Sequence, residues 1–187
     1  MARAYLICFL LVTMTGLGAV AQQLAPGSVS VKLWDYCDPA SFGPGCSRSV
    51  DGGFITFGGF LTEITSEHSV GAWRFSPSDL IVKEGTPAIT VNNVGGESHT
   101  FTRVKEFGGG FVPILNTLSG NNTPALECAQ LVNGILAPQP FGPMNLFVPA
   151  GATLAAAGFK GDETVNVQCC IHPWMRSTIN GHHEDKK

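Results

Sequence analysis

The chain has 187 residues, with 11 Lys and Arg against 14 Asp and Glu and a formal net charge of −3 at pH 7. It carries no basic patch, which argues against nucleic acid or anionic lipid as a partner. Its 23 Gly and 12 Pro, with many Val, Thr and Phe and few long helical patterns, predict an all-β domain with many turns.

Residues 1–21 have the features of a secretory signal peptide. A basic residue, Arg3, precedes an apolar run from Tyr5 to Val12, and small residues end at Ala19-Val20-Ala21. This A-x-A pattern predicts cleavage before Gln22. A retained membrane anchor is the other interpretation, although the run is short for a spanning helix. We therefore expect a periplasmic or secreted protein, with no membrane insertion after the signal is removed.

Residues 22–70 are expected to form an N-terminal extension that packs on the core of the main domain. Within it, 28–34 is strand-like, a turn-rich loop covers 35–53, and 54–64 fits either a strand or a short helix. Asp35, Asp38 and Asp51 could be read as a calcium cluster. Because Asp is common in turns, we interpret them as turn residues.

The main domain is predicted over 71–180, where short strands recur at near-regular spacing. Strands are expected at 73–76, 79–83, 88–93, 99–105, 145–148, 153–157 and 163–168, with turn signals between them. The chain leaves through 176–180, and 181–187 is expected to be a flexible tail. Short strands at this spacing predict a β-sandwich.

The stretch 106–143 is too long for a simple connection and indicates an insertion with a functional or capping role. Gly108-Gly109-Gly110 predicts a flexible beginning. Thr123-Pro124 has the pattern of an N-cap followed by proline in the first turn. A short helix is therefore expected from Pro124 to about Val132, and it would carry Cys128.

The segment from Cys169 to Met175 places a thiol, an imidazole (His172) and a thioether at intervals of three residues. These donors are softer than oxygen and favour copper over magnesium or calcium. A blue-copper site needs two histidines, one thiolate and a weak axial methionine, and His99 is the candidate for the missing donor. Zinc is the main rival metal, but Met is not among its usual ligands.

In order, spacing and residue type, His99, Cys169, His172 and Met175 resemble the ligand set of the cupredoxins. The loop is similar to the amicyanin and pseudoazurin type, and the likeness spans about 71–180. The resemblance implies a Greek-key β-sandwich that holds one copper per chain in a type 1, Cu(I)/Cu(II) site. It also implies that the backbone N–H of Thr100 bonds to the Cys169 sulfur and tunes the potential.

The cysteine count is consistent with this resemblance. Of six cysteines, Cys8 falls within the expected signal, which leaves an odd number in an exported chain. If Cys169 is the metal thiolate, four remain for two disulfides. Proximity in the sequence favours Cys37–Cys46, leaving Cys128–Cys170. A Cys170 ligand with Cys169 in a disulfide stays open, but its Cys-x-His spacing fits the family poorly.

The resemblance implies a one-electron carrier with transient redox-protein partners, and not an enzyme. In cupredoxins the second histidine reaches the surface inside an apolar patch, so His172 is expected to be the electron port, with Pro173 and Trp174 as its rim. Trp174 fits plain core packing equally well. The alternative function is a copper carrier that delivers the metal with the same ligands. The sequence offers no second histidine cluster for a catalytic metal.

Overall fold

The computed structural model describes residues 29–46, 55–83, 85–157, 159 and 162–182. The expected signal, the calcium-cluster residue Asp51 and positions 183–187 of the expected tail lie outside these ranges. The strands are β1 (Ser30–Trp34), β2 (Arg74–Ser76), β3 (Asp79–Lys83), β4 (Ala88–Asn93), β5 (His99–Val104), β6 (Ala129–Val132), β7 (Ile135–Pro138), β8 (Asn145–Val148), β9 (Thr153–Ala157), β10 (Thr164–Gln168) and β11 (Arg176–His182). The helices are α1 (Pro39–Phe42), the 3₁₀ turn η1 (Gly43–Gly45), α2 (Phe57–Glu67) and α3 (Pro113–Leu118).

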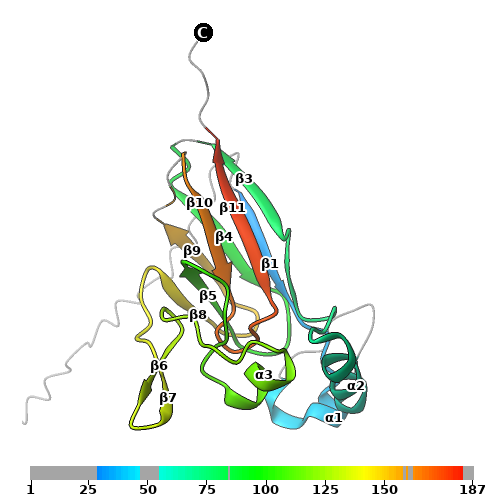
Figure 1. Ribbon diagram of the computed structural model, residues 1–187. Coiled ribbons are helices and arrows are strands. Elements are labelled where there is room, and N and C mark those ends of the chain that lie inside the picture. Colours follow the sequence, from blue (N-terminus) through cyan, green and yellow to red (C-terminus); the bar gives the residue numbers. More distant parts are fainter. Residues whose placement is uncertain (1–28, 47–54, 84, 158, 160–161, 183–187) are drawn as a thin grey trace, which may run out of the picture.

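The strands form two facing sheets and a separate hairpin (Figure 1). One sheet has the order β2-β1-β4-β9 and the other β3-β11-β10-β5-β8. β1 runs parallel to β4 and β3 parallel to β11, whereas the other neighbours are antiparallel. The connections β4–β5, β8–β9 and β9–β10 each cross from one sheet to the other. This arrangement confirms the expected all-β, Greek-key sandwich.

The core lies between the sheets and is filled by side chains that alternate along each strand. In β1, Val31 and Leu33 are fully buried while Lys32 is exposed, which is the two-residue period of a half-buried strand. The buried cluster runs without a break to Cys169 and Met175. The predicted ligand loop is therefore part of the packed core.

β1 comes from the segment expected to form an N-terminal extension. It lies between β2 and β4 in the first sheet, with Leu33 opposite both Phe75 and Asn93. The first sheet thus recruits residues that precede position 71. Within the ambiguous stretch 54–64, residues from Phe57 onward belong to α2, and the Thr56 hydroxyl caps this helix by accepting the Gly59 N–H.

The helix expected from Pro124 to about Val132 is wrong. Ala129–Val132 is β6, which pairs with β7 across the two-residue turn Asn133-Gly134. Both turn residues have positive φ, 53° and 80°, as a type I′ hairpin requires. The helix of the insertion is α3, further upstream. The hairpin signal of Asn-Gly between apolar residues outweighs the local capping pattern at Pro124.

The glycines at the beginning of the insertion are tightly packed rather than flexible. A Cβ on Gly110 would overlap the carbonyl oxygen of Cys170, and a Cβ on Gly108 would lie 2.8 Å from the backbone nitrogen of Ala125. Glycine is needed here because two backbone segments approach closely.

The elements added to the sandwich gather at one end of it. In Figure 1, α1, α2 and α3 lie at the same end as the turn between β10 and β11, and the β6–β7 hairpin extends beside them. That turn contains the predicted ligand loop. The additions therefore surround the candidate site.

Candidate metal centre

Three predicted ligands come together because their strands are neighbours. His99 is the first residue of β5, Cys169 directly follows β10, and His172 lies in the turn that leads into β11. β10 pairs with both β5 and β11. The beginning of β5 and the end of β10, some seventy residues apart in the sequence, thus lie at the same end of one sheet.

The donor atoms of these residues all lie within 4.8 Å of one another. The Cys169 sulfur is 3.8 Å from Nδ1 of His99 and 3.8 Å from Nδ1 of His172. The two Nδ1 atoms are 3.2 Å apart. His99 and Cys169 are fully buried, and His172 retains 4% of its surface.

Backbone hydrogen bonds hold the ligand loop in a tight turn. The Cys169 N–H donates to the Met175 carbonyl at 3.0 Å, and the Met175 N–H donates to the His172 carbonyl at 2.9 Å. The Met175 side chain is fully buried in the core cluster that includes Cys169. The sulfur of Cys169 accepts the N–H groups of Thr100 at 3.3 Å and His172 at 3.4 Å. The Thr100 bond is the contact that the resemblance implies.

Each histidine hydrogen-bonds a carboxylate through its outer nitrogen. Nε2 of His99 lies 2.8 Å from Oδ2 of Asp35, a residue that is itself fully buried. Nε2 of His172 lies 3.2 Å from Oε2 of Glu97, whose side chain is 19% exposed. A carboxylate accepts only, so it places the proton of a neutral imidazole on Nε2 and leaves Nδ1 with a free lone pair.

The pKa values of Cys169, His172 and His99 all shift in the directions that favour a thiolate beside protonated imidazoles. Burial alone would raise the pKa of the Cys169 thiol, but its contacts with His172 and His99 outweigh burial and hold that pKa well below its usual range. Burial would lower the pKa of His172, yet bonds to Cys169 and Glu97 raise it to about 9. The thiolate is the form of cysteine that binds metal ions.

The pair formed by His99 and Asp35 behaves in the same way. Burial opposes both charged forms, but the short bond between the two side chains raises the pKa of His99 and lowers the pKa of Asp35. Contact with Cys169 raises the pKa of His99 further. The pair therefore supports charge in the interior, where an unpaired ion is strongly disfavoured.

The three converging donors fit a metal ion of the copper or zinc class. With both Nε2 atoms donating to carboxylates, two Nδ1 lone pairs and a thiolate face one another across less than 4 Å. Such donors repel unless protons or a cation lie between them. Nitrogen and sulfur donors are the ligands of copper and zinc, whereas magnesium and calcium prefer oxygen.

The exposed imidazole edge expected at His172 is covered in the structure. The ring of Trp174 lies 5.4 Å from the His172 ring, and Trp73 lies 6.4 Å from it on the side shared with Glu97. Phe60 of α2 packs against both tryptophans. Pro173 is buried and Trp174 is half-buried. The sequence did not anticipate this cover because α2 belongs to the segment outside the resemblance.

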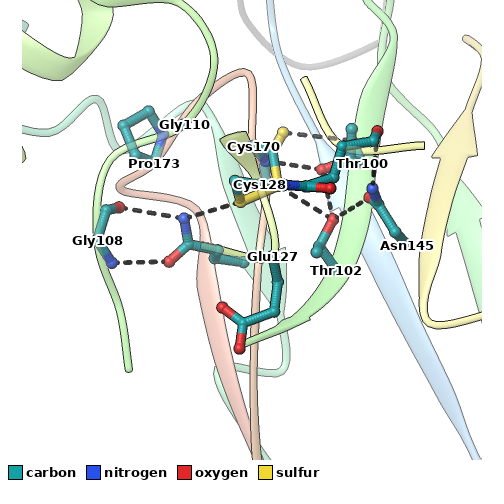
Figure 2. The surroundings of a disulfide bond; sticks show 12 residues. Thr100, Thr102, Gly108, Gly110, Glu127, Cys128, Asn145, Cys170 and Pro173 are labelled. Atoms are coloured by element: carbon teal, nitrogen blue, oxygen red, sulfur yellow. Dashed lines mark hydrogen bonds between the residues drawn. A yellow bond between two sulfur atoms is a disulfide. The ribbon is translucent and has the colours of Figure 1, made fainter. Parts of the chain in front are cut away.

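Both expected disulfides are present in the structure. Cys37 pairs with Cys46 and Cys128 pairs with Cys170, which leaves Cys169 as the free thiol among the cysteines that the structure describes. Figure 2 shows the second disulfide beside Thr100 and Thr102 of β5, with Gly108 and Gly110 on its other side. Cys170 is thereby occupied as a structural residue next to the candidate ligand.

Sequence reasoning missed the two carboxylates. Asp35 was assigned to a turn, but it accepts hydrogen bonds from the Gly96 and Glu97 backbone N–H groups as well as from His99. The one available signal was Gly95-Gly96, because a side chain on Gly95 would overlap the Asp35 carboxylate. Nothing local connects Asp35 to a turn sixty residues later.

Comparisons with known proteins give distant structural likenesses only. No family model and no curated protein matches this sequence. Among solved structures, a novel purple cupredoxin from Nitrosopumilus maritimus has a TM-score of 0.40 and 14% identity, covering 84% of this chain and 100% of that chain. A reduced Cu(I) form of an amicyanin variant at pH 4 has a TM-score of 0.38 and 13% identity, covering 87% of each chain. The fold and the candidate metal centre therefore rest on the strand order and the converging side chains of this chain.

Proposed function

We propose that this chain is a type 1 copper protein that carries single electrons between redox partners. One observation carries the proposal: the sulfur of Cys169 and two imidazole nitrogens converge in a buried cluster, with both outer nitrogens held by carboxylates. Copper bound there would supply one-electron Cu(I)/Cu(II) chemistry. His99, Cys169 and His172 are the proposed strong ligands, and Met175 is the proposed weak fourth donor.

The surroundings of the three residues favour electron transfer because they restrict movement. The turn from Cys169 to Met175 is closed by backbone hydrogen bonds, and the neighbouring Cys170 is tied to the insertion by a disulfide. The two N–H donors to the Cys169 sulfur stabilise a thiolate in place. Ligands fixed in this way need little rearrangement when one electron is gained or lost.

Burial of the site disfavours the alternative function in copper delivery. His99, Cys169 and Met175 are fully buried, so transfer of a metal ion to an acceptor would require the ligand loop to open. An electron needs no such opening. We therefore expect slow loss of copper to a chelator and fast exchange of electrons.

We propose that electrons enter and leave through the edge of His172 and the aromatic cover beside it. The rings of Trp174 and Phe60 lie 6.0 Å apart, and Phe57 of α2, 45% exposed, lies 6.4 Å from Phe60. This series of rings leads from His172 to an apolar surface. Small apolar surfaces suit the brief encounters of redox proteins.

Location outside the cytoplasm is proposed on the basis of the disulfides, which persist in oxidising compartments. Among the described residues, no helix is long and apolar enough to cross a membrane.

The experiment that tests the copper site is a titration of the purified metal-free protein with Cu(II), followed by optical spectroscopy. We expect a strong thiolate-to-copper band at one copper per chain. Cys169→Ser should abolish the band, whereas the matched double variant Cys128→Ala/Cys170→Ala should retain it. A band that survives Cys169→Ser, or the lack of any band in the native chain, would refute the site.

The electron route is tested by the rate at which an inorganic one-electron oxidant oxidises the reduced, copper-loaded protein. Trp174→Ala should slow this oxidation while leaving the optical band intact. Leu131→Ala, on the exposed hairpin (69% exposed), is the control and should leave both unchanged. Equal rates in the native chain and in Trp174→Ala would argue against the route.

A further inference from the structure

Both candidate histidines contact a carboxylate through Nε2, the nitrogen that faces away from Cys169, and the two carboxylates come from different parts of the chain. Asp35 follows β1 and contacts His99, while Glu97 lies in the turn before β5 and contacts His172. These two carboxylates flank the site at the outer nitrogens, and the thiolate of Cys169 lies at the inner ones.

The carboxylate of Asp35 is fixed by more than its histidine. Oδ1 accepts the Gly96 N–H at 2.6 Å, and Oδ2 accepts the Glu97 N–H at 3.1 Å in addition to His99 at 2.8 Å. The side chain is fully buried. It therefore orients both the turn that precedes β5 and the imidazole ring that begins β5.

Glu97 is also part of a built arrangement and not an incidental surface ion pair. Its Oε2 accepts from the indole N–H of the buried Trp73 at 3.1 Å while contacting His172 at 3.2 Å. Its backbone carbonyl accepts from the Asn93 side chain at 2.8 Å. The carboxylate is thus held toward His172 by contacts from β4 and from the aromatic cover.

We propose that Asp35 and Glu97 are positioning residues that aim both imidazoles at Cys169 and lower the reduction potential of the copper bound there. This inference rests on the copper function proposed above. Cu(II) carries one more positive charge than Cu(I), so nearby negative charge stabilises the oxidised state. The effect is large where water is excluded, because charges interact more strongly at low dielectric.

The decisive variants remove the charge while keeping the shape and an acceptor oxygen: Glu97→Gln and Asp35→Asn. The reduction potential of each copper-loaded variant is measured by redox titration against mediators of known potential. Each should shift the equilibrium toward Cu(I) by about tenfold or more, which is about 59 mV upward for one electron. Glu67→Gln, which removes an exposed charge from α2, is the matched control and should shift it less than about twofold because solvent screens it.

A second measurement reports on position directly. In the diamagnetic Cu(I) form, nitrogen-15 NMR should show the ring proton of both histidines on Nε2, with slow exchange in the native chain. Exchange of the His172 ring proton should be faster in Glu97→Gln, because an amide is a weaker acceptor than a carboxylate. Exchange at His99 should not change in that variant.

The outcomes separate this inference from the function on which it rests. A native chain without a copper band would refute both. A native chain with the band, in which Glu97→Gln shifts the potential no more than Glu67→Gln, would overturn the inference and leave the copper function standing. If Asp35→Asn does not fold, Glu97→Gln alone decides the question.

Discussion

Two segments that the sequence could not match to a known pattern meet the metal end of the sandwich in different ways. The N-terminal segment, 22–70, contributes a side chain, Asp35, that contacts a candidate ligand directly. The insertion, 106–143, contacts the ligand loop through its backbone and a disulfide. The first acts through charge and the second through geometry.

The insertion is itself divided. Its first half is bonded to the loop: the Phe111 N–H donates to the Cys170 carbonyl at 2.9 Å, and the Gln168 side chain pairs with the Gly108 backbone at 3.0 and 3.1 Å. The β6–β7 hairpin that follows exposes large apolar side chains, including Leu131 and Ile135. Length outside a known pattern therefore does not measure importance to the site, whereas bonds to the ligand loop do.

The largest expected effect comes from removing the disulfides, one in each segment. Cys128–Cys170 closes a separation of 42 residues and Cys37–Cys46 one of 9. A longer closed loop restricts the unfolded chain more, so Cys128→Ala/Cys170→Ala should lose about 4 kcal/mol of unfolding free energy and Cys37→Ala/Cys46→Ala about 2.5 kcal/mol. Urea denaturation of the metal-free proteins measures both. If Cys37→Ala/Cys46→Ala lost more unfolding free energy than Cys128→Ala/Cys170→Ala, the insertion would not be the segment more tightly coupled to the rest of the fold.

The next largest loss of stability is expected where the insertion closely approaches the ligand loop. Gly110→Ala should destabilise the fold by about 3 kcal/mol, because its methyl group would overlap the backbone of Cys170 and the shift would disturb the paired hydrogen bonds between Gly110 and Asn116. Gly142→Ala is the control, since no atom lies within 4 Å of its added carbon. Denaturation midpoints that fall equally in both variants would contradict the tight packing.

The parts of this structure that sequence reasoning predicted are those that local pattern encodes. The bounds of β3, β4, β8 and β9 agree with the strands expected from alternation and turns. The pairing of Cys169 with His172 followed from donor type and three-residue spacing in one loop, and His99 was the candidate for the donor that this loop lacks. These features depend on residues close to one another in the sequence or on one well-marked strand.

The parts that were missed depend on contacts between distant segments. Asp35 and His99 are 64 residues apart, and Asp35 reads locally as a turn residue. The covering of His172 requires Phe60 of α2 to lie over Trp174, a contact that no pattern near the ligand loop predicts. The β6–β7 hairpin was encoded locally by Asn133-Gly134, but the pattern at Pro124 was given more weight.

A smaller loss of stability is expected when the charge of Asp35, in the N-terminal segment, is removed. The folded protein lowers the pKa of Asp35 below its ordinary value of 3.8, so the unfolded chain binds this proton more readily. The stability that Asp35 contributes is therefore present above pH about 4 and is lost as the pH falls further. Asp35→Asn should cost about 2 kcal/mol at pH 6, and the difference from the native chain should shrink as the pH falls below about 4. A difference that stays constant with pH would assign the loss to shape alone.

The smallest effect is expected in the hairpin, where the insertion departs from the site. Leu131 and Ile135 are 69% and 72% exposed, so replacing both with Ser removes little buried apolar surface. The unfolding free energy should change by less than about 0.5 kcal/mol, as for other surface substitutions. The copper absorption band should also be unchanged, because the bonds to the ligand loop come from residues before β6. A clear loss of stability or a shifted band would mean that the hairpin packs on the site, and the division of the insertion into a coupled half and a free half would then be wrong.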